Sequence, residues 1–166
     1  LAGEIARGVG RWVDRFVLYD SFIGFLAELG RFDEALRIAN RVKPSSLKSY
    51  VFGMVSKAYL KHGSLDKALF IARKVSRPSA KGSLLVDIAE WCVANGKPAR
   101  AKKLLSDALV TARSRKLGRA EKVEMCESVA LAYSALGMSR QGLQAARMIQ
   151  DKKKREQVLK RIGQGL

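Results

Sequence analysis

Apolar side chains recur along the chain in blocks that each end at a glycine. These glycines are Gly30, Gly63, Gly96 and Gly137, spaced 33, 33 and 41 residues apart. The residues eleven, eight and four positions before each glycine are apolar or aromatic: Tyr19, Phe22 and Leu26; Phe52, Val55 and Tyr59; Leu85, Ile88 and Cys92; Cys126, Val129 and Tyr133. Spacings of three and four residues place each set on one face of an α-helix. We expect each glycine to end that helix in the left-handed conformation.

A second helix is expected after each glycine. A small residue follows five positions later, where two helices can pack closely: Ala35, Ala68, Ala101 and Gly142. Further along, Ile38, Ala39 and Val42 recur as Ile71, Ala72 and Val75. Pro44 and Pro78 are expected to close the second helices of the first two units. The third unit has about eight extra residues without a breaker before Gly118, so its second helix is predicted to be about two turns longer.

Each unit is therefore predicted to be a helix hairpin, and a period near 33 residues is typical of stacked helical repeats. The expected repeats span about 12–46, 47–79, 80–120 and 121–153, followed by a capping helix over 154–166. The first ten residues look like the remnant of an earlier helix. No strand pattern is present, so the predicted fold is an all-α solenoid forming one domain over 1–166, which could be a fragment of a longer chain. Stacking is required because a single hairpin cannot bury its apolar face alone.

The repeats resemble the tetratricopeptide repeat family, most closely in the stretch "VSKAYLKHGSLDKALFIARKV". The resemblance covers roughly residues 12–162 and implies a right-handed α-solenoid. The chain departs from the family pattern at Ala39 and Ala72, where the family has a large aromatic residue, and its closing prolines come early. A pentatricopeptide repeat would imply base-by-base reading of RNA through paired polar positions. No regular polar pairs occur, which disfavours that alternative.

The charge balance is the unusual feature of the composition. Thirty-two Lys and Arg residues face fifteen Asp and Glu residues, giving a net charge of +17 and a pI near 10.3. Such a chain attracts polyanions. The alternative is a solvated basic surface without an anionic partner.

The repeat register predicts where these cations gather. The position fifteen residues before each glycine is always basic, at Arg15, Lys48, Lys81 and Lys122, and Arg155 continues the column. Each residue falls at the start of a first helix, where the helix dipole disfavours a cation by a few tenths of a kcal/mol. The ends of the second helices lie in the same turn regions and carry Arg41, Lys43, Arg73, Lys74, Arg77, Arg113, Arg115, Lys116, Arg119, Lys152, Lys153 and Lys154. We interpret these residues as a basic edge that binds RNA phosphates.

A groove lined by the first helices is predicted as a protein-binding site. Its candidate residues are Tyr50, Lys57, Lys61, Glu124 and Glu127, with Leu60 nearby. The mixed charge of this groove favours the edge over the groove for phosphate binding. Exposed aromatic residues are expected to be scarce, which argues against a single-strand binder.

The pattern offers little for catalysis. His62 is expected to be a turn residue, and it has no Cys partners at zinc-ligand spacing. The glycines are isolated rather than grouped in a phosphate-binding loop. Cys92 and Cys126 sit in apolar helical patterns and are expected to be reduced core residues. We expect no enzyme, no metal and no cofactor.

Several expectations concern partners and location. No apolar run approaches the ~20 residues of a membrane span, and no signal peptide is visible, so a cytoplasmic protein without a membrane partner is expected. The leading hypothesis is a non-catalytic module that docks on structured RNA or a ribonucleoprotein such as a ribosomal subunit, as an adaptor or regulator of translation. The alternatives are a scaffold for acidic proteins or peptides and a DNA-associated accessory protein. A further protein partner or a second copy would bind the groove or the capping helix.

Overall fold

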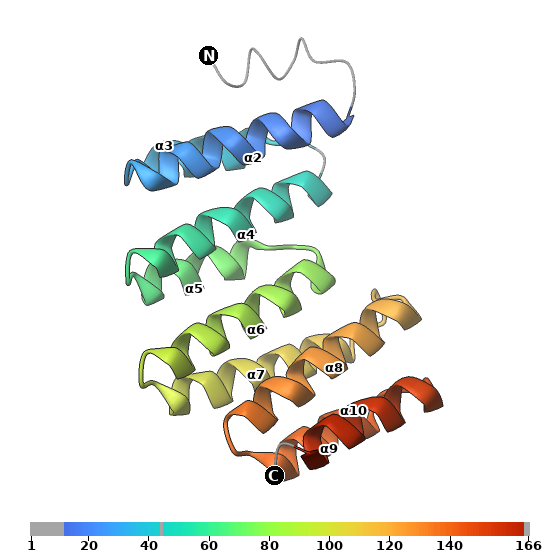
Figure 1. The fold of residues 1–166 in the computed structure, drawn as a ribbon. Coiled ribbons are helices and arrows are strands. Elements are labelled where there is room, and N and C mark those ends of the chain that lie inside the picture. Colours follow the sequence, from blue (N-terminus) through green and yellow to red (C-terminus); the bar gives the residue numbers. More distant parts are fainter. Residues whose placement is uncertain (1–11, 44, 165–166) are drawn as a thin grey trace. The chain divides into compact units, whose positions relative to one another are not determined.

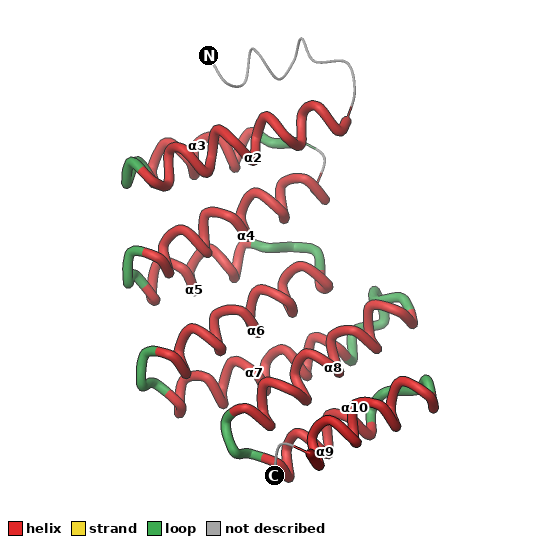
Figure 2. Tube along the Cα trace, in the orientation of Figure 1, coloured by secondary structure: helices red, strands yellow, loops and turns green. Residues whose placement is uncertain are grey.

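A computed structural model describes residues 12–43 and 45–164, without the side chains of 12–16, 20, 45 and 46. Within these residues the regular structure is helical and no strand is present (Figure 2). The predicted all-α class is confirmed. Contacts divide the chain into two compact units, 1–80 and 81–166. One solenoid through both units stays a prediction, and the expectation for the first ten residues lies outside the described residues.

The first unit contains two helix hairpins (Figure 1). The first pairs α2 (Trp12–Glu28) with α3 (Phe32–Arg41), and the second pairs α4 (Ser45–Lys61) with α5 (Leu65–Lys74). The helix α4 packs against α2, α3 and α5. Phe32, at the start of α3, stacks on Tyr59 of α4 with ring centroids 4.2 Å apart. This contact brings the Gly30 and Gly63 turns to one end of the unit.

The second unit contains two further hairpins and a last helix. The hairpins are α6 (Pro78–Ala94) with α7 (Pro98–Ala112), and α8 (Arg119–Ala135) with α9 (Ser139–Arg147); α10 (Lys152–Gln164) follows. The helix α6 begins at the boundary with the first unit. The helix α8 packs against α7, α9 and α10. The Tyr133 hydroxyl, late in α8, donates to the Lys102 carbonyl early in α7 at 3.5 Å, so the two glycine turns share one end here also.

The four predicted glycine turns are confirmed. Gly30, Gly63, Gly96 and Gly137 have φ of 69°, 71°, 67° and 68°. At the first turn, the Arg31 N–H donates to the Leu26 carbonyl at 2.8 Å and the Gly30 N–H donates to the Ala27 carbonyl at 3.0 Å. The same two bonds recur at the other three turns. They satisfy helix-end carbonyls, and the left-handed residue between them is most easily a glycine.

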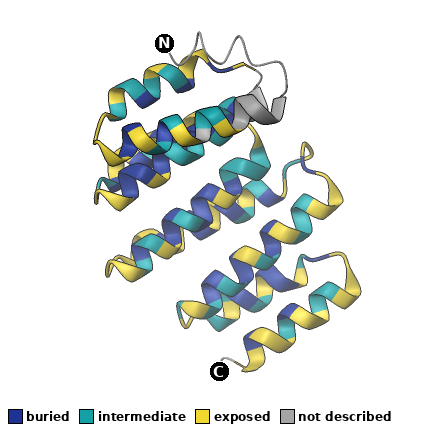
Figure 3. Ribbon diagram, turned by 45° about the horizontal axis from the view of Figure 1, so that its top comes forward, coloured by how far each residue is buried: buried dark blue, intermediate teal, exposed yellow. Residues whose placement is uncertain are grey.

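The predicted core positions are buried in α4, α6 and α8 (Figure 3). In α2, Leu26 is buried, whereas Tyr19 and Phe22 are half-buried. The small residues of the second helices are all buried: Ala35, Ala68, Ala101 and Gly142. A Cβ added at Gly142 would stand 2.9 Å from the Ala130 carbonyl oxygen, so α9 approaches α8 as closely as backbone allows. The predicted close packing of the hairpins is therefore present.

One local expectation was wrong. Pro78 does not close α5; it is the first residue of α6, where a proline loses no helical hydrogen bond. The helix α5 ends earlier because Val75 is extended, with φ of −69° and ψ of 114°. Pro44 lies outside the described residues. Each of α4, α6, α8 and α10 begins two residues before the predicted repeat boundary.

The extra length of the third hairpin is shared between helix and turn. The helix α7 ends at Ala112, which is about one and a half turns beyond the end of α5 in the repeat register rather than two. Ser114 then organises a turn, because its hydroxyl accepts the Lys116 N–H at 3.2 Å and its carbonyl accepts the Leu117 N–H at 3.3 Å. Leu117 is buried and anchors this turn.

Candidate nucleic-acid interface

In each unit the predicted phosphate-binding residues lie at the end away from the glycine turns. We call this the basic end of the unit. In the first unit it carries Arg41, Lys43, Lys48, Arg73, Lys74 and Arg77. In the second unit it carries Lys81, Arg113, Arg115, Lys116, Arg119, Lys122, Lys152, Lys153, Lys154 and Arg155. Arg15 falls in α2, but its side chain lies outside the description.

Most of these cations are exposed, but the column at the helix starts is not. Lys48, Lys81, Lys122 and Arg155 are each half-buried. Lys48 Nζ donates to the Asn40 carbonyl at 3.1 Å and lies 5.7 Å from the centroid of the Phe52 ring. Asn40 is in the last turn of α3, where carbonyls have no partner within their own helix. Lys48 therefore satisfies a helix end.

Arg155 has the same role in the second unit. Its Nη1 donates at 3.0 Å to the carbonyl of Ile149, just beyond the end of α9. The sequence analysis considered only the dipole of the helix that carries each cation, and so found no stabilising role for the cation. That inference was incomplete. A cation at the start of a first helix closes the end of the preceding second helix. Two members of the column thus have a stabilising reason to be basic.

The loop after α5 is held in place by a buried serine. The Ser49 hydroxyl accepts the Arg77 N–H at 3.4 Å and lies 3.4 Å from the Ser76 hydroxyl. The exposed pair Arg73 and Lys74 ends α5, where cations also interact favourably with the helix dipole. The end of α5 and this loop together present three cations, Arg73, Lys74 and Arg77.

An exposed aromatic ring accompanies these cations. Phe70 is 57% exposed, and Lys74 Nζ lies 4.8 Å from its ring centroid. Phe25 on α2 is also exposed. Among the described aromatic residues, these two are exposed and the others are half-buried or buried. In the repeat register Phe70 matches Arg37 of the preceding second helix, and this position is exposed in both hairpins. A polar residue at Arg37 was the sequence signal that Phe70 would be exposed.

The start of α10 is tied to α8. The Asp151 carboxylate accepts the Lys154 N–H at 2.8 Å, which caps α10. Lys154 Nζ pairs with Glu127 of α8 at 2.9 Å, and Arg161 pairs with the same carboxylate at 3.4 Å. Lys154 is thus half-buried in an internal ion pair. Lys152 and Lys153, beside it, are exposed.

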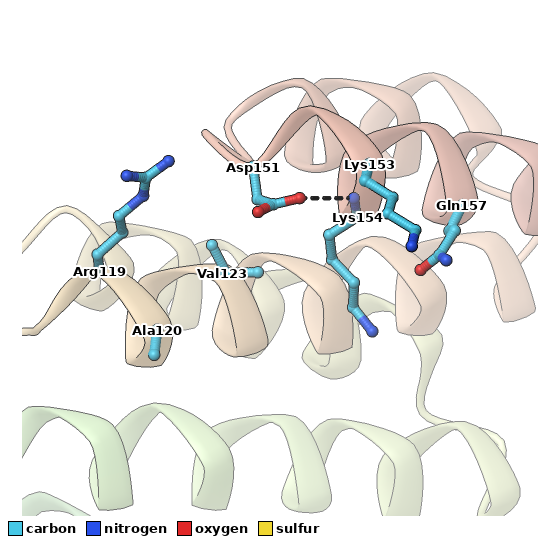
Figure 4. Close-up of a pocket in the computed structure, with 7 residues that line it drawn as sticks. All are labelled: Arg119, Ala120, Val123, Asp151, Lys153, Lys154 and Gln157. Carbon is cyan, nitrogen blue, oxygen red and sulfur yellow. Dashed lines mark hydrogen bonds between the residues drawn. The ribbon is translucent and has the colours of Figure 1, made fainter.

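An open groove of about 590 Å³ lies between the first turns of α8 and α10 (Figure 4). Its apolar lining comes from Ala120 and Val123. Its polar lining comes from Arg119, Asp151, Lys153, Lys154 and Gln157. Three of the predicted phosphate-binding residues, Arg119, Lys153 and Lys154, are therefore brought to one groove. The capping bond of Asp151 occupies one of its carboxylate oxygens.

The predicted protein-binding groove is only partly supported by exposure. Lys57, Lys61 and Glu124 are exposed and Tyr50 is half-buried. Leu60 is buried and cannot line a groove. Glu127 is not a free acid, because it holds Lys154 and Arg161 of α10. A predicted groove residue is instead part of the contact between α8 and α10.

The sequence analysis missed one further basic residue at the end of a second helix. Arg147 is exposed in the last turn of α9, equivalent to Arg41 and Arg73 at the ends of their helices. The signal was a basic residue just before the end of a second helix. The sequence interpretation placed the fourth cluster only at Lys152–Lys154.

The reactive groups of the described chain are buried or dispersed. Cys92 and Cys126 are free and buried, as predicted. Burial raises the pKa of both thiols, while nearby Lys97 and Arg100 lower that of Cys92 and Arg113 lowers that of Cys126. A raised pKa keeps a thiol protonated and unreactive. Among the described residues, no three His, Cys, Asp or Glu side chains gather as they would around a metal ion. His62 is exposed beside Gly63, and its ring meets Phe32 edge-on at 5.1 Å.

Comparison with known proteins identifies no family. No protein-family model matches the chain, and no curated protein matches it. The crystal structure of Ton1535 from Thermococcus onnurineus NA1 is similar at 13% identity with a TM-score of 0.47, over 95% of this chain and 51% of that one. The chain thus spans about half the length of Ton1535. None of the helices in the described ranges is long and apolar enough to cross a membrane.

Proposed function

We propose that the hairpins stack as a right-handed α-solenoid similar to tetratricopeptide repeats, with α10 as the capping helix. Two features support this proposal. The four glycine turns share one conformation and one pair of hydrogen bonds. The position four residues before each glycine and the position five residues after it are buried in all four hairpins. Both are what a repeated structural unit requires.

We propose that this solenoid is a non-catalytic module that docks on structured RNA or a ribonucleoprotein such as a ribosomal subunit, as an adaptor or regulator of translation. The observation that carries the proposal is the gathering of exposed cations at the basic end of each unit. Lysine and arginine side chains on helix ends suit backbone phosphates, which position a protein on a folded RNA without reading its sequence.

Contacts within the protein narrow the set of cations that we propose for RNA binding. Lys48 and Arg155 bind carbonyls of the protein itself and Lys154 binds Glu127. The exposed residues at the ends of second helices and in the following turns, such as Arg73, Lys74, Arg115 and Lys116, are better placed for an external phosphate. Phe70 beside Lys74 adds a surface on which an unpaired base at the edge of a folded RNA could stack.

A salt titration with two matched variants tests the proposal. The first variant changes Arg73, Lys74, Arg115 and Lys116 to Gln. The second changes Lys61, Lys102, Lys103 and Arg140 to Gln, which are exposed near the glycine turns. Each loses four charges, from +17 to +13, so both have the same net charge. Affinity for a folded RNA is measured from about 50 to 300 mM NaCl, beside duplex DNA and an acidic polypeptide.

We expect steep salt dependence for the unchanged chain with RNA. Each lost phosphate contact lowers the slope of log affinity against log salt by about 0.7 to 0.9, so the basic-end variant should lose roughly three units of slope. The glycine-end variant should lose much less. Equal slopes for the two variants would mean that net charge alone drives binding and that no RNA site exists. Stronger binding to duplex DNA would instead support the DNA-associated alternative.

The second candidate function is a scaffold for acidic proteins or peptides. The groove between α8 and α10 favours it, because an apolar floor at Ala120 and Val123 is flanked by Arg119 and Lys153. An acidic segment with an apolar side chain would match that arrangement. Binding of the acidic polypeptide alone, lost on Val123→Asp and kept on Lys103→Gln, would favour this function over RNA docking.

A further inference from the structure

The groove between α8 and α10 has features that a site for phosphate alone does not need. Its volume of about 590 Å³ lies within the range of small-ligand pockets, about 300–1,000 Å³. Its apolar lining, Ala120 and Val123, offers no donor to a phosphate. Asp151 also lines the groove, and a carboxylate repels an anion. The groove therefore fits a ligand that carries an apolar surface and N–H donors as well as negative charge.

Cations lie on both sides of the groove (Figure 4). Arg119, at the start of α8, lies on one side, and Lys153, in the first turn of α10, lies on the other. Both residues are exposed, and neither side chain forms a hydrogen bond with another lining residue. Lys154 is different, because Glu127 binds its ammonium group at 2.9 Å. Arg119 and Lys153 are thus placed to bind the phosphates on either side of one nucleotide.

Asp151 and Gln157 supply the polar part of the groove. The Asp151 carboxylate accepts the Lys154 N–H at 2.8 Å. That bond uses one of about four lone-pair positions on the two carboxylate oxygens, so the group can still accept two parallel N–H donors. Gln157 lies one turn after Lys153 on α10, and its amide can both donate and accept. Groups of this kind bind the Watson–Crick edge of an unpaired base.

The carboxylate of Asp151 discriminates between bases. Guanine presents two adjacent N–H donors on its Watson–Crick edge, N1–H and N2–H, which match the two oxygens of a carboxylate. The other three bases present a donor beside an acceptor. That acceptor would face a carboxylate oxygen, and neither group would be satisfied. The groove is therefore best matched by guanine.

We propose that the groove binds one unpaired guanosine nucleotide of a folded RNA. The base lies against Ala120 and Val123 with its Watson–Crick edge on Asp151, and the flanking phosphates lie on Arg119 and Lys153. This inference rests on the proposed RNA docking, and it adds selectivity for one nucleotide to a contact that otherwise follows phosphates. An acidic peptide fits the groove less well, because Asp151 would repel it.

Three hairpin RNAs with one stem sequence test the proposal at a single salt concentration. The first has one unpaired guanosine in the stem, the second has an unpaired adenosine at that place, and the third is fully paired. We expect the unchanged chain to bind the guanosine hairpin at least about fivefold more tightly than the other two, the lower end for a bidentate base contact.

Two variants with the same change of charge locate that preference. Asp151→Asn keeps a residue that can cap α10 but replaces one acceptor by a donor, so the preference for guanosine should disappear. The matched control is Glu156→Gln, an exposed acid on α10 outside the groove lining, which should keep the preference. Circular dichroism of both variants confirms that they are folded.

Four results would overturn the proposal. Equal binding of the three hairpins, with steep salt dependence, would remove the nucleotide site and leave RNA docking in place. No binding of any hairpin would remove both. A guanosine preference that survives Asp151→Asn would place the nucleotide elsewhere on the protein. Tighter binding of the acidic polypeptide to Asp151→Asn, without any guanosine preference, would assign the groove to acidic peptides.

Discussion

Two glycines inside helices have opposite surroundings, although the sequence gives both the same residue type. On α9, a Cβ added to Gly142 would stand 2.9 Å from the Ala130 carbonyl oxygen and 3.5 Å from the Ser134 nitrogen. On α4, a Cβ added to Gly53 would meet nothing within 4 Å. Gly142 is required because the backbone of α8 lies too close for a side chain. Gly53 has no such neighbour and only lowers the stability of its helix.

Replacing each glycine by alanine should therefore change stability in opposite directions. Gly142→Ala must push α9 away from α8 and should lower the free energy of unfolding by roughly 1–3 kcal/mol. Gly53→Ala should raise it by about 0.5–1 kcal/mol through helix propensity. Urea unfolding followed by circular dichroism measures both. A stabilising Gly142→Ala would show that α8 and α9 can separate without loss, contrary to the close approach described above.

At the scale of the helix, the cations that begin α4 and α10 act on the helix before them. Lys48 reaches the Asn40 carbonyl at the end of α3, and Arg155 reaches the Ile149 carbonyl beyond α9. A charged donor to a helix-end carbonyl gains both a hydrogen bond and a favourable interaction with the dipole. The gain offsets the unfavourable position of the cation at its own helix start.

We expect Arg155→Gln to lower the free energy of unfolding by roughly 1 kcal/mol, because a charge-assisted hydrogen bond is lost. The matched control is Lys153→Gln, two residues earlier on α10 and exposed, which should change stability by less than about 0.5 kcal/mol. Thermal unfolding of the two variants at one ionic strength makes the comparison. If Arg155→Gln and Lys153→Gln behave alike, the bond to Ile149 contributes nothing, and Arg155 returns to the set of cations free for phosphate.

The helices show what a sequence register can and cannot predict. The glycine turns and the core positions followed from spacing alone, because a 3.6-residue period and a left-handed helix end leave few alternatives. The partner of Lys48 or Glu127 could not be found in that way. Each partner lies on a different helix from the residue that it binds. Which residue becomes the partner depends on where that other helix begins or ends. Pro78 illustrates the same limit, since a proline suits both the region after a helix and the first turn of the next.

At the scale of the whole molecule, composition alone shows the excess of positive charge. It does not show which cations bind groups of the protein itself and which are exposed to a partner. The sequence interpretation treated Lys48, Lys154 and Arg155 like their neighbours. The structure separates them, because these three bind groups within the protein while Arg73, Lys74, Arg115 and Lys116 are exposed. The candidate site is therefore a subset of the predicted edge, described separately in each unit.

A net charge of +17 on 166 residues should also make the folded chain repel itself. Salt screens that repulsion, with a Debye length that falls from about 10 Å at 0.1 M to about 3 Å at 1 M. We therefore expect the midpoint of thermal unfolding to rise between about 50 and 500 mM NaCl, although the same salt should weaken the proposed RNA binding. Exposed ion pairs such as Arg31 with Glu34 are screened as well, but they contribute little to stability. The two four-charge Gln variants, both at +13, should show smaller rises than the unchanged chain. A midpoint that falls with salt would mean that attractive pairs outweigh repulsion, and the excess of cations would then need no anionic partner to be tolerated.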